Sequence, residues 1–208
     1  MESKRIAVLI SGSGSNLQSL IDAQKNRFFN GEICLVVSNR KSAYGLERAR
    51  LNNIRSINIS IAQYPTVQEF DNFLLQILEE EKIDLIVLAG YLRFVSDIIV
   101  KKFKNRIVNI HPSLLPSFGG EGYYGIRVHE AVIERGCKLS GATVHFVDES
   151  HDTGPIIFQK AIEVCQDWDA EELQRQVLKI EHEILPLAVK YYCDDKLLVK
   201  DHRVYIKE

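Results

Sequence analysis

The sequence predicts an α/β fold built on a doubly wound, mostly parallel sheet, with an antiparallel C-terminal extension. Short apolar, β-branched segments alternate with helical segments through the first half of the 208-residue chain. Such alternation is typical of a parallel sheet that is covered by helices on both faces. The second half carries two strand-like segments joined by a short turn, a pattern that indicates antiparallel pairing. No repeat, low-complexity segment or linker divides the chain, so we expect one domain over 1–208.

Five apolar segments of the first half are expected to form parallel strands, and helices are expected between them. The expected strands lie at 5–10, 33–37, 55–59, 84–89 and 106–110, and the expected helices lie near 15–26, 43–52 and 66–81. Sheets of this kind bind ligands just beyond the carboxyl ends of their strands. The loops that follow these segments are therefore the first place to look for a functional site.

The second half is expected to contain two strands, a long helix and a short hairpin. The strands are expected at 142–147 and 156–161, on either side of a turn with Asp152, Thr153, Gly154 and Pro155. Asp169 begins a capping box that predicts the start of the helix, and Pro186 is expected to end or kink that helix. The tail from 196 to 207 is typical of a small edge hairpin.

Composition argues against several classes of protein. The chain has 46% hydrophobic and 26% charged residues and a net charge of −2, which gives no electrostatic footprint for nucleic acid or an anionic membrane. No apolar segment approaches the ~20 residues that span a bilayer, and the N-terminus lacks the features of a secretory signal. The four cysteines are scattered, so neither a metal site nor a disulfide framework is expected. We therefore expect a cytoplasmic protein that acts on small molecules.

The segment Gly12-Ser13-Gly14-Ser15-Asn16 follows the first strand and leads into the first helix. Backbone N–H groups at a helix N-terminus attract anions, and glycine lets the backbone approach a phosphate closely. The dinucleotide fingerprint is absent because Leu17 occupies its third glycine position. A single phosphate is therefore the favoured ligand, with Ser15 and Asn16 as additional donors. The alternative is an ordinary tight turn in which Ser15 caps the helix.

Asn109 and His111 lie at the end of the fifth expected strand, where their side chains project to the same face. An amide can donate to a developing oxyanion, and an imidazole can transfer a proton or carry positive charge beside it. Pro112 and Pro116 restrict the loop that follows, at the edge of the sheet where ligands bind. The alternative for His111 is a hydrogen-bonded core histidine.

Asp152 is open to two interpretations. It could accept a hydrogen bond in an Asx-turn, or it could be the carboxylate that orients His111 and raises the pKa of His111. His145 lies in the middle of an expected strand, and we expect it to be structural. No nucleophile motif is present, and no histidine has a partner at metal-ligand spacing.

Together, and in this order, these motifs resemble the folate-dependent glycinamide ribonucleotide formyltransferases of purine synthesis. The matching segments cover nearly the whole chain: LISGSGSNL (9–17), SNR followed by GLERA (38–49), VLAGYLRFVS (87–96), NIHPSLLPSF (109–118), GATVHFV (141–147), DTGPIIFQ (152–159) and EHEILP (181–186). The resemblance implies a Rossmann-like formyltransferase fold, with a nucleotide-binding half at 1–111 and a folate-binding, C-terminal half at 112–208. It implies that the amine of glycinamide ribonucleotide attacks the formyl carbon of the co-substrate 10-formyltetrahydrofolate, through a tetrahedral intermediate and without a metal.

The resemblance also implies roles for individual residues. The catalytic set is Asn109, which would donate to the oxyanion, His111, and Asp152, which would keep His111 protonated. The residues implied for glycinamide ribonucleotide are Gly14, Ser15 and Asn16 at its phosphate and Glu181 at its ribose hydroxyls. The residues implied for folate, mostly through backbone groups, are Val67, Leu92, Arg93, Phe94, Val95, Asn109, Asp148 and Asp152. The chain departs from the family pattern at Val67 (often basic), at Leu178 (often lysine, with Lys179 beside it here) and in the longer stretch 119–132.

Other functions remain open as alternatives. A 10-formyltetrahydrofolate hydrolase would release formate, and we would expect an N-terminal regulatory domain in it. Methionyl-tRNA formyltransferase would need a further RNA-binding domain and a basic surface. A non-catalytic nucleotide- or folate-binding module would be expected to lack one of the three implied catalytic residues. A monomer or a homodimer is expected.

Overall fold

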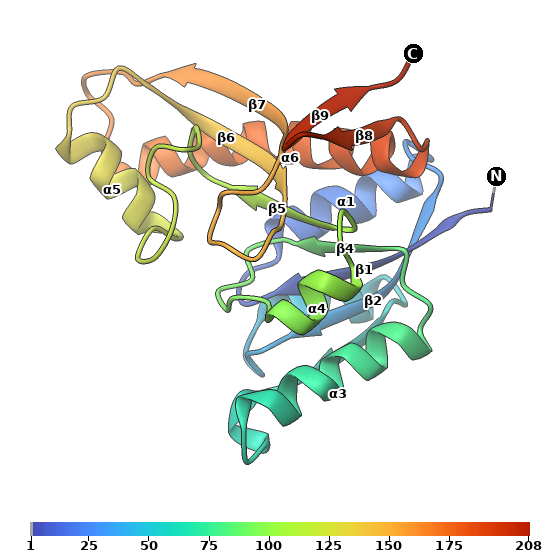
Figure 1. Ribbon diagram of the computed structural model, residues 1–208. Helices are drawn as coiled ribbons and strands as arrows, with labels where there is room; N and C mark the ends of the chain where they lie inside the picture. Colours follow the sequence, from blue (N-terminus) through green and yellow to red (C-terminus); the bar gives the residue numbers. More distant parts are fainter. Residues whose placement is uncertain (1) are drawn as a thin grey trace.

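Seven strands form one sheet in the order β3-β2-β1-β4-β5-β6-β7 in the computed structural model, which describes residues 2–208 (Figure 1). The strands are β1 (Lys4–Ile10), β2 (Gly31–Ser38), β3 (Arg55–Asn58), β4 (Leu85–Leu88), β5 (Ile107–His111), β6 (Leu139–Phe146) and β7 (Ile156–Glu163). Strands β1 to β5 run parallel, and β6 pairs antiparallel with both β5 and β7. The predicted fold class is confirmed.

Helices cover both faces of this sheet. They are α1 (Ser15–Lys25), α2 (Tyr44–Leu51), α3 (Val67–Glu80), α4 (Asp97–Lys102), α5 (Ile126–Glu134) and α6 (Ala170–Cys193), with a 3₁₀ turn η1 (Ile61–Gln63). Side chains alternate between the two faces of a strand, so Ile6 and Val8 of β1 belong to different layers from Ala7 and Leu9. The first pair packs with α1 and α6, and the second pair packs with α3 and α4 on the opposite face (Figure 1).

The strand order reverses between β1 and β4. The chain builds β1, β2 and β3 outward in one direction and then returns to place β4 on the other side of β1. At such a reversal the loops that follow the two neighbouring strands turn away from each other and leave a crevice. The Ser11 amide after β1 donates to the carbonyl of Gly90 after β4, at 3.0 Å, which ties the two loops together at the base of that crevice.

Three features of the chain differ from the sequence-based expectations. The sequence predicts that Pro186 ends or kinks its helix, and the first alternative is wrong because α6 continues through Pro186 to Cys193. Pro186 is buried with its helical neighbours, and the packing of this face offsets the missing backbone hydrogen bond. The C-terminal hairpin is confirmed, but β8 (Leu197–Lys200) and β9 (Arg203–Ile206) form a sheet of their own. Helices α4 and α5 had no counterpart in the sequence analysis.

Within residues 2–208, no helix combines the length and the apolar character that crossing a membrane requires.

Candidate active site

A cleft of about 780 Å³ opens at the carboxyl ends of β1, β4 and β5. A cleft of this size suits small molecules. Its lining comes from the segments 11–16, 88–95, 109–112, 120–125 and 147–152, together with Arg40, Arg127, His129, His145, Gln174, Leu178 and Glu181. Of the residues that the sequence analysis singled out for a ligand, Val67 alone lies outside this lining. It is 52% exposed at the start of α3.

The loop after β1 presents backbone amides to the cleft. Gly14 adopts a left-handed conformation, with φ 71°, and the first helical hydrogen bond of α1 runs from Gln18 N to Gly14 O. The amides that precede Gln18 in the first turn therefore have no partner within the helix. Ser15 is the first residue of α1 and not its cap, and Gly14 in the cap position has no side chain to offer. The interpretation of Ser15 as a helix cap is wrong.

This loop is held in place by α2. A Cβ atom on Gly14 would lie only 2.6 Å from Gly45 Cα, so glycine is required where the loop meets the start of α2. The Gly45 amide donates to Gly12 O at 3.1 Å, and Arg48 Nε donates to Ser13 O at 2.9 Å. The loop conformation therefore depends on a helix that begins some 30 residues later in the chain.

Asn16 and Glu181 meet across the cleft although 165 positions separate them. Asn16 Nδ2 donates to Glu181 Oε2 at 2.6 Å, and within residues 2–208 Asn16 Oδ1 has no partner. Burial raises the pKa of Glu181 to about 7, although the hydrogen bond from Asn16 opposes this rise. The two residues that the resemblance assigned to different parts of one nucleotide thus lie side by side.

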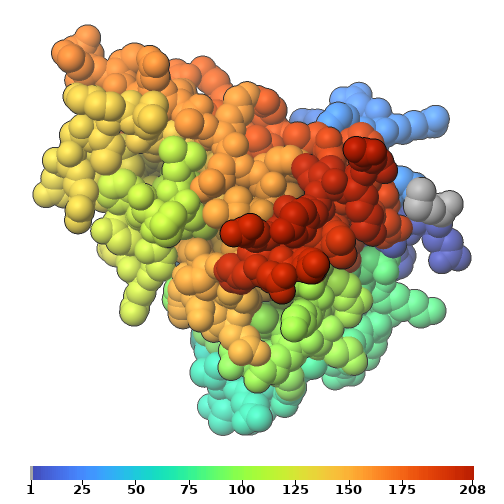
Figure 2. Space-filling model, turned by 45° about the horizontal axis from the view of Figure 1, so that its top comes forward, coloured from blue at the N-terminus to red at the C-terminus, as the bar shows by residue number. Residues whose placement is uncertain are grey.

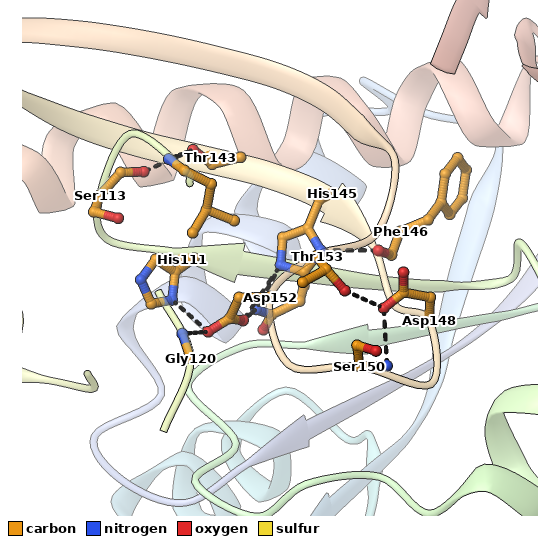
Figure 3. Close-up of polar contacts among 12 residues, drawn as sticks. His111, Ser113, Gly120, Thr143, His145, Phe146, Asp148, Ser150, Asp152 and Thr153 are labelled. Carbon is orange, nitrogen blue, oxygen red and sulfur yellow. Dashed lines mark hydrogen bonds and ion pairs between the residues drawn. The ribbon is translucent and has the colours of Figure 1, made fainter. Parts of the chain in front are cut away.

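Asn109, His111 and Asp152 also come together. His111 Nδ1 lies 3.5 Å from Asp152 Oδ2, and Asn109 Nδ2 lies 3.4 Å from Asp152 Oδ1. The Gly120 amide donates to Asp152 Oδ2 at 2.9 Å and fixes the carboxylate from a third segment of the chain (Figure 3). No local sequence pattern shows that these side chains meet. They converge from β5 and from the loop between β6 and β7.

The ring of His111 has a defined tautomer. Its Nε2 lies 2.7 Å from the carbonyl oxygen of Phe118, which can only accept, so Nε2 carries a hydrogen. In the neutral ring, Nδ1 therefore presents a lone pair toward Asp152. Burial lowers the pKa of His111 below its ordinary value, and the nearby Asp152 charge opposes this shift without cancelling it. Asp152 therefore acts in the direction that the sequence predicts, because it raises the pKa of His111, but the cost of burying the charged ring is the larger effect.

Asp152 is not the turn acceptor of its own loop. Asp148 Oδ1 has that role, because it accepts from Ser150 N at 3.2 Å and from Thr153 Oγ1 at 2.9 Å (Figure 3). Burial tends to raise the pKa of Asp152, but its contacts with His145, His111 and the Gly120 amide outweigh burial and lower the pKa. The carboxylate is therefore held in its charged form beside His111.

His145 belongs to the site, which the sequence analysis missed. It stands directly opposite Asn109 in the antiparallel pairing of β5 and β6, and its Nε2 lies 3.1 Å from Asn109 Nδ2. His145 Nδ1 donates to Phe146 O at 2.8 Å, so in the neutral ring Nε2 accepts from the Asn109 amide. Both hydrogens of the Asn109 amide thus face acceptors, namely His145 and the more distant Asp152. Only the register of the two strands reveals this contact.

The segment after β4 lines the neighbouring part of the cleft. Ser11 Oγ accepts from the Leu92 amide at 2.8 Å, and the side chains of Leu92 and Phe94 are 44% and 57% exposed. The Arg93 guanidinium turns away toward α3, where it lies 3.9 Å from the Asp71 carboxylate and above the Phe70 ring. The side chain of Arg93 is thus engaged elsewhere, which leaves the backbone of this segment to face a ligand.

Comparison with known proteins gives consistent matches over almost the whole chain. A family model described as formyl transferase matches residues 4–189. The phosphoribosylglycinamide formyltransferase of Haemophilus influenzae is 36% identical, over 98% of this chain and 93% of that protein. The chloroplastic phosphoribosylglycinamide formyltransferase of Vigna unguiculata is 39% identical, and the match covers 94% of this chain but only 62% of the relative. In the trifunctional purine biosynthetic protein of Drosophila melanogaster the match covers 14% of the relative.

Solved structures show the same fold. The glycinamide ribonucleotide transformylase 1 of Symbiobacterium toebii superposes with a TM-score of 0.94 at 41% identity, covering 99% of this chain and 94% of that one. A formyltetrahydrofolate deformylase from Pseudomonas syringae superposes with a TM-score of 0.90 at 24% identity, over 67% of its length, and supports the fold alone.

Proposed function

Because the chain belongs to the formyl transferase family, we propose that it transfers the formyl group of 10-formyltetrahydrofolate to the amine of glycinamide ribonucleotide, in purine biosynthesis. The observation that carries this proposal is the cluster of Asn109, His111 and Asp152 in the same cleft as the amide-lined loop after β1. Phosphate, amine and formyl donor can then meet in one space. The relatives named above as phosphoribosylglycinamide formyltransferases support the choice of substrate.

Glycinamide ribonucleotide would bind with its phosphate at the backbone amides of Gly14, Ser15 and Asn16. The start of a helix favours an anion there. Glu181, beside Asn16, would accept hydrogen bonds from the ribose hydroxyls. The nucleotide would thus extend from the loop after β1 toward His111.

The folate would occupy the neighbouring part of the cleft, where the segment from Leu92 to Val95 and the loop around Asp148 face each other. Exposed apolar side chains at Leu92 and Phe94 suit a flat heterocycle, and backbone groups would read its polar edge. Val67 is proposed only as a neighbour of the distal tail, because it lies outside the cleft lining. Both halves of the chain, 1–111 and 112–208, would contribute to each substrate. The nucleotide would contact Gly14 and Glu181, and the folate would contact Leu92 and Asp148, so each substrate has one partner from either half.

The chemistry would proceed by direct attack. The substrate amine forms a bond to the formyl carbon, the carbonyl π electrons move to oxygen, and a tetrahedral oxyanion results. The amine proton passes to the Nδ1 lone pair of His111, and the resulting imidazolium is stabilised by Asp152 at 3.5 Å. The same proton then moves to the departing folate nitrogen as its bond to carbon breaks. No covalent enzyme intermediate is required.

Asn109 would act on the oxyanion in this scheme. Its amide donates to His145 at 3.1 Å and toward Asp152 at 3.4 Å, and the longer contact is the weaker one. We propose that Asn109 exchanges the Asp152 contact for the oxyanion as the tetrahedral intermediate forms. His145 would meanwhile hold the amide plane in place.

The deciding experiment is incubation of the protein with 10-formyltetrahydrofolate, with and without glycinamide ribonucleotide. Formylated nucleotide that appears only when both substrates are present is the expected result. Release of formate without the nucleotide would identify a hydrolase instead. Binding of both compounds without turnover would identify a non-catalytic module.

The variant His111→Ala tests the assignment within the site. Turnover should be lost, while calorimetric affinity for glycinamide ribonucleotide should stay within about three-fold, because the phosphate would bind at a separate strand end. A collapse of nucleotide affinity in the folded variant would count against the assigned roles.

A further inference from the structure

One buried titratable side chain of the cleft has no place in the scheme above. His129, on α5, is 1% exposed and lines the cleft. Within residues 2–208 its Nδ1 atom has no hydrogen-bond partner. Buried polar atoms are almost always paired, because leaving one without a partner destabilises the folded state. A ring nitrogen left unpaired beside a ligand cleft therefore points to a ligand.

The chain brings His129 to the site through the segment that joins β5 to α5. Phe118 O in that segment accepts from His111, and the Gly120 amide donates to Asp152. Gly125, with φ 55°, is the N-cap residue that precedes α5. On this helix His129 shares the buried face with Val128 and Val132, so the same segment that contacts the catalytic residues also fixes the buried imidazole.

The electrostatic environment of His129 defines what it can bind. Burial lowers the pKa of His129 to about 4, and repulsion from the nearby His111 ring adds to this effect. At neutral pH the ring is uncharged, with one donor and one acceptor nitrogen. Such a ring is a weak partner for a phosphate dianion but a good one for a neutral amide or amine.

We infer that His129 is a substrate-binding residue, which hydrogen-bonds the glycinamide end of the nucleotide and directs its amine toward the formyl carbon beside His111. This inference rests on the proposed function and adds the recognition of the glycinamide group to it. The glycinamide end offers both N–H donors and a carbonyl acceptor, so it suits a neutral imidazole. The phosphate and ribose have their own partners near Gly14 and Glu181, which leaves the third part of the nucleotide for His129.

The first test compares kinetics in three variants. His129→Phe fills the same space without a hydrogen bond, His129→Asn places an amide near the position of Nδ1, and Glu130→Gln alters an exposed residue of the same helix as a control. His129→Phe should raise the KM for glycinamide ribonucleotide at least ~10-fold, the scale of one hydrogen bond, with the folate KM within about two-fold. His129→Asn should recover most of the loss. An unchanged nucleotide KM in folded His129→Phe would overturn the inference.

The second test uses the unmodified protein and therefore does not depend on the stability of a variant. In the ¹⁵N spectrum of the imidazole rings of the unmodified protein, glycinamide ribonucleotide should shift the His129 signals, whereas ribose 5-phosphate, which lacks the glycinamide, should leave them in place. Equal responses to the two compounds would overturn the inference. Failure of the proposed function is a separate result, because the unmodified enzyme would then give no formylated nucleotide.

Discussion

At Asp152, one substitution can remove the charge of the side chain while keeping its shape. Asp152→Asn keeps the size of the side chain and an oxygen that can accept from Gly120, but it removes the negative charge 3.5 Å from His111. The pKa of His111, already lowered by burial, should fall further because the opposing charge is gone. We expect turnover to fall at least ~100-fold, the scale of losing a positioned acid–base group, with little change in melting temperature. Turnover assays and NMR titration of the ring measure both effects.

Asp148→Asn is the matched comparison in the same loop. Asp148 accepts from Ser150 and Thr153, and an amide oxygen can accept both hydrogen bonds, so the turn should survive. Its effect on turnover should be much smaller than that of Asp152→Asn. Near-normal turnover in Asp152→Asn, with an unmoved His111 titration, would reduce Asp152 to a structural residue.

Glu181 predicts a pH dependence of stability. Its pKa is about 7 in the folded protein and about 4.3 when exposed in the unfolded chain. Between these two pKa values the folded protein keeps a proton on Glu181 that the unfolded chain has already lost. The free energy of unfolding therefore falls as the pH rises from about 4 to about 7. Over this pH range the free energy of unfolding of the wild type should fall by on the order of 3 kcal/mol more than that of Glu181→Gln, which cannot titrate at this position. Urea unfolding of both proteins at pH 4.5 and 7.5 measures this difference. The same change in the free energy of unfolding in both proteins would contradict the prediction.

At the scale of elements, the contact between the loop after β1 and α2 can be tested with two glycines. Gly14→Ala forces a side chain into a left-handed conformation and against Gly45, so the loop must move. We expect a loss of stability of at least ~1 kcal/mol and a raised KM for glycinamide ribonucleotide, with the folate KM nearly unchanged. Gly12→Ala is the control, because a Cβ there meets no atom within 4 Å. Equal effects of the two variants on nucleotide KM would contradict the role of the Gly14–Gly45 contact.

The elements also show what the sequence could and could not predict. Continuous apolar runs identified β1, β2, β4 and β5, because strands buried on both faces must be apolar throughout. The same logic placed Asn109 and His111 at the ligand-binding edge. Helix α5 was missed, and with it the burial of His129, because the glycine-rich stretch before it gives no regular helical start. The sequence predicts a structural role for His145, because its contact with Asn109 depends on strand register, which no local pattern contains.

At the scale of the whole molecule, the C-terminal hairpin reaches the catalytic loop. Figure 2 shows β8 and β9 lying against the segment that joins β6 and β7. His202 Nε2 lies 2.8 Å from the carbonyl oxygen of Thr153, which directly follows Asp152. His202→Ala removes this hydrogen bond at the surface. We expect faster hydrogen exchange in residues 148–153 and a fall in kcat/KM of about two- to ten-fold, because the loop that carries Asp152 loses a tether.

The control for this prediction is Arg203→Ala, an exposed change in the same hairpin. It should alter neither the exchange of the loop nor the rate. If His202→Ala also leaves both unchanged, the hairpin and the catalytic loop are neighbours without functional coupling.

The meeting of Gly14 and Gly45 has a consequence for how such a chain can evolve. A Cβ on Gly14 would lie 2.6 Å from Gly45 Cα, and a Cβ on Gly45 would clash with Ile10 Cδ1 and lie 3.2 Å from Gly14 Cα, so neither position has room for a larger residue. A mutation at Gly14 is therefore expected to be eliminated by selection unless the loop and α2 separate in the same lineage, and a mutation at Gly45 must also displace the Ile10 side chain. Across many related sequences, both positions should therefore remain glycine, although 30 residues lie between them.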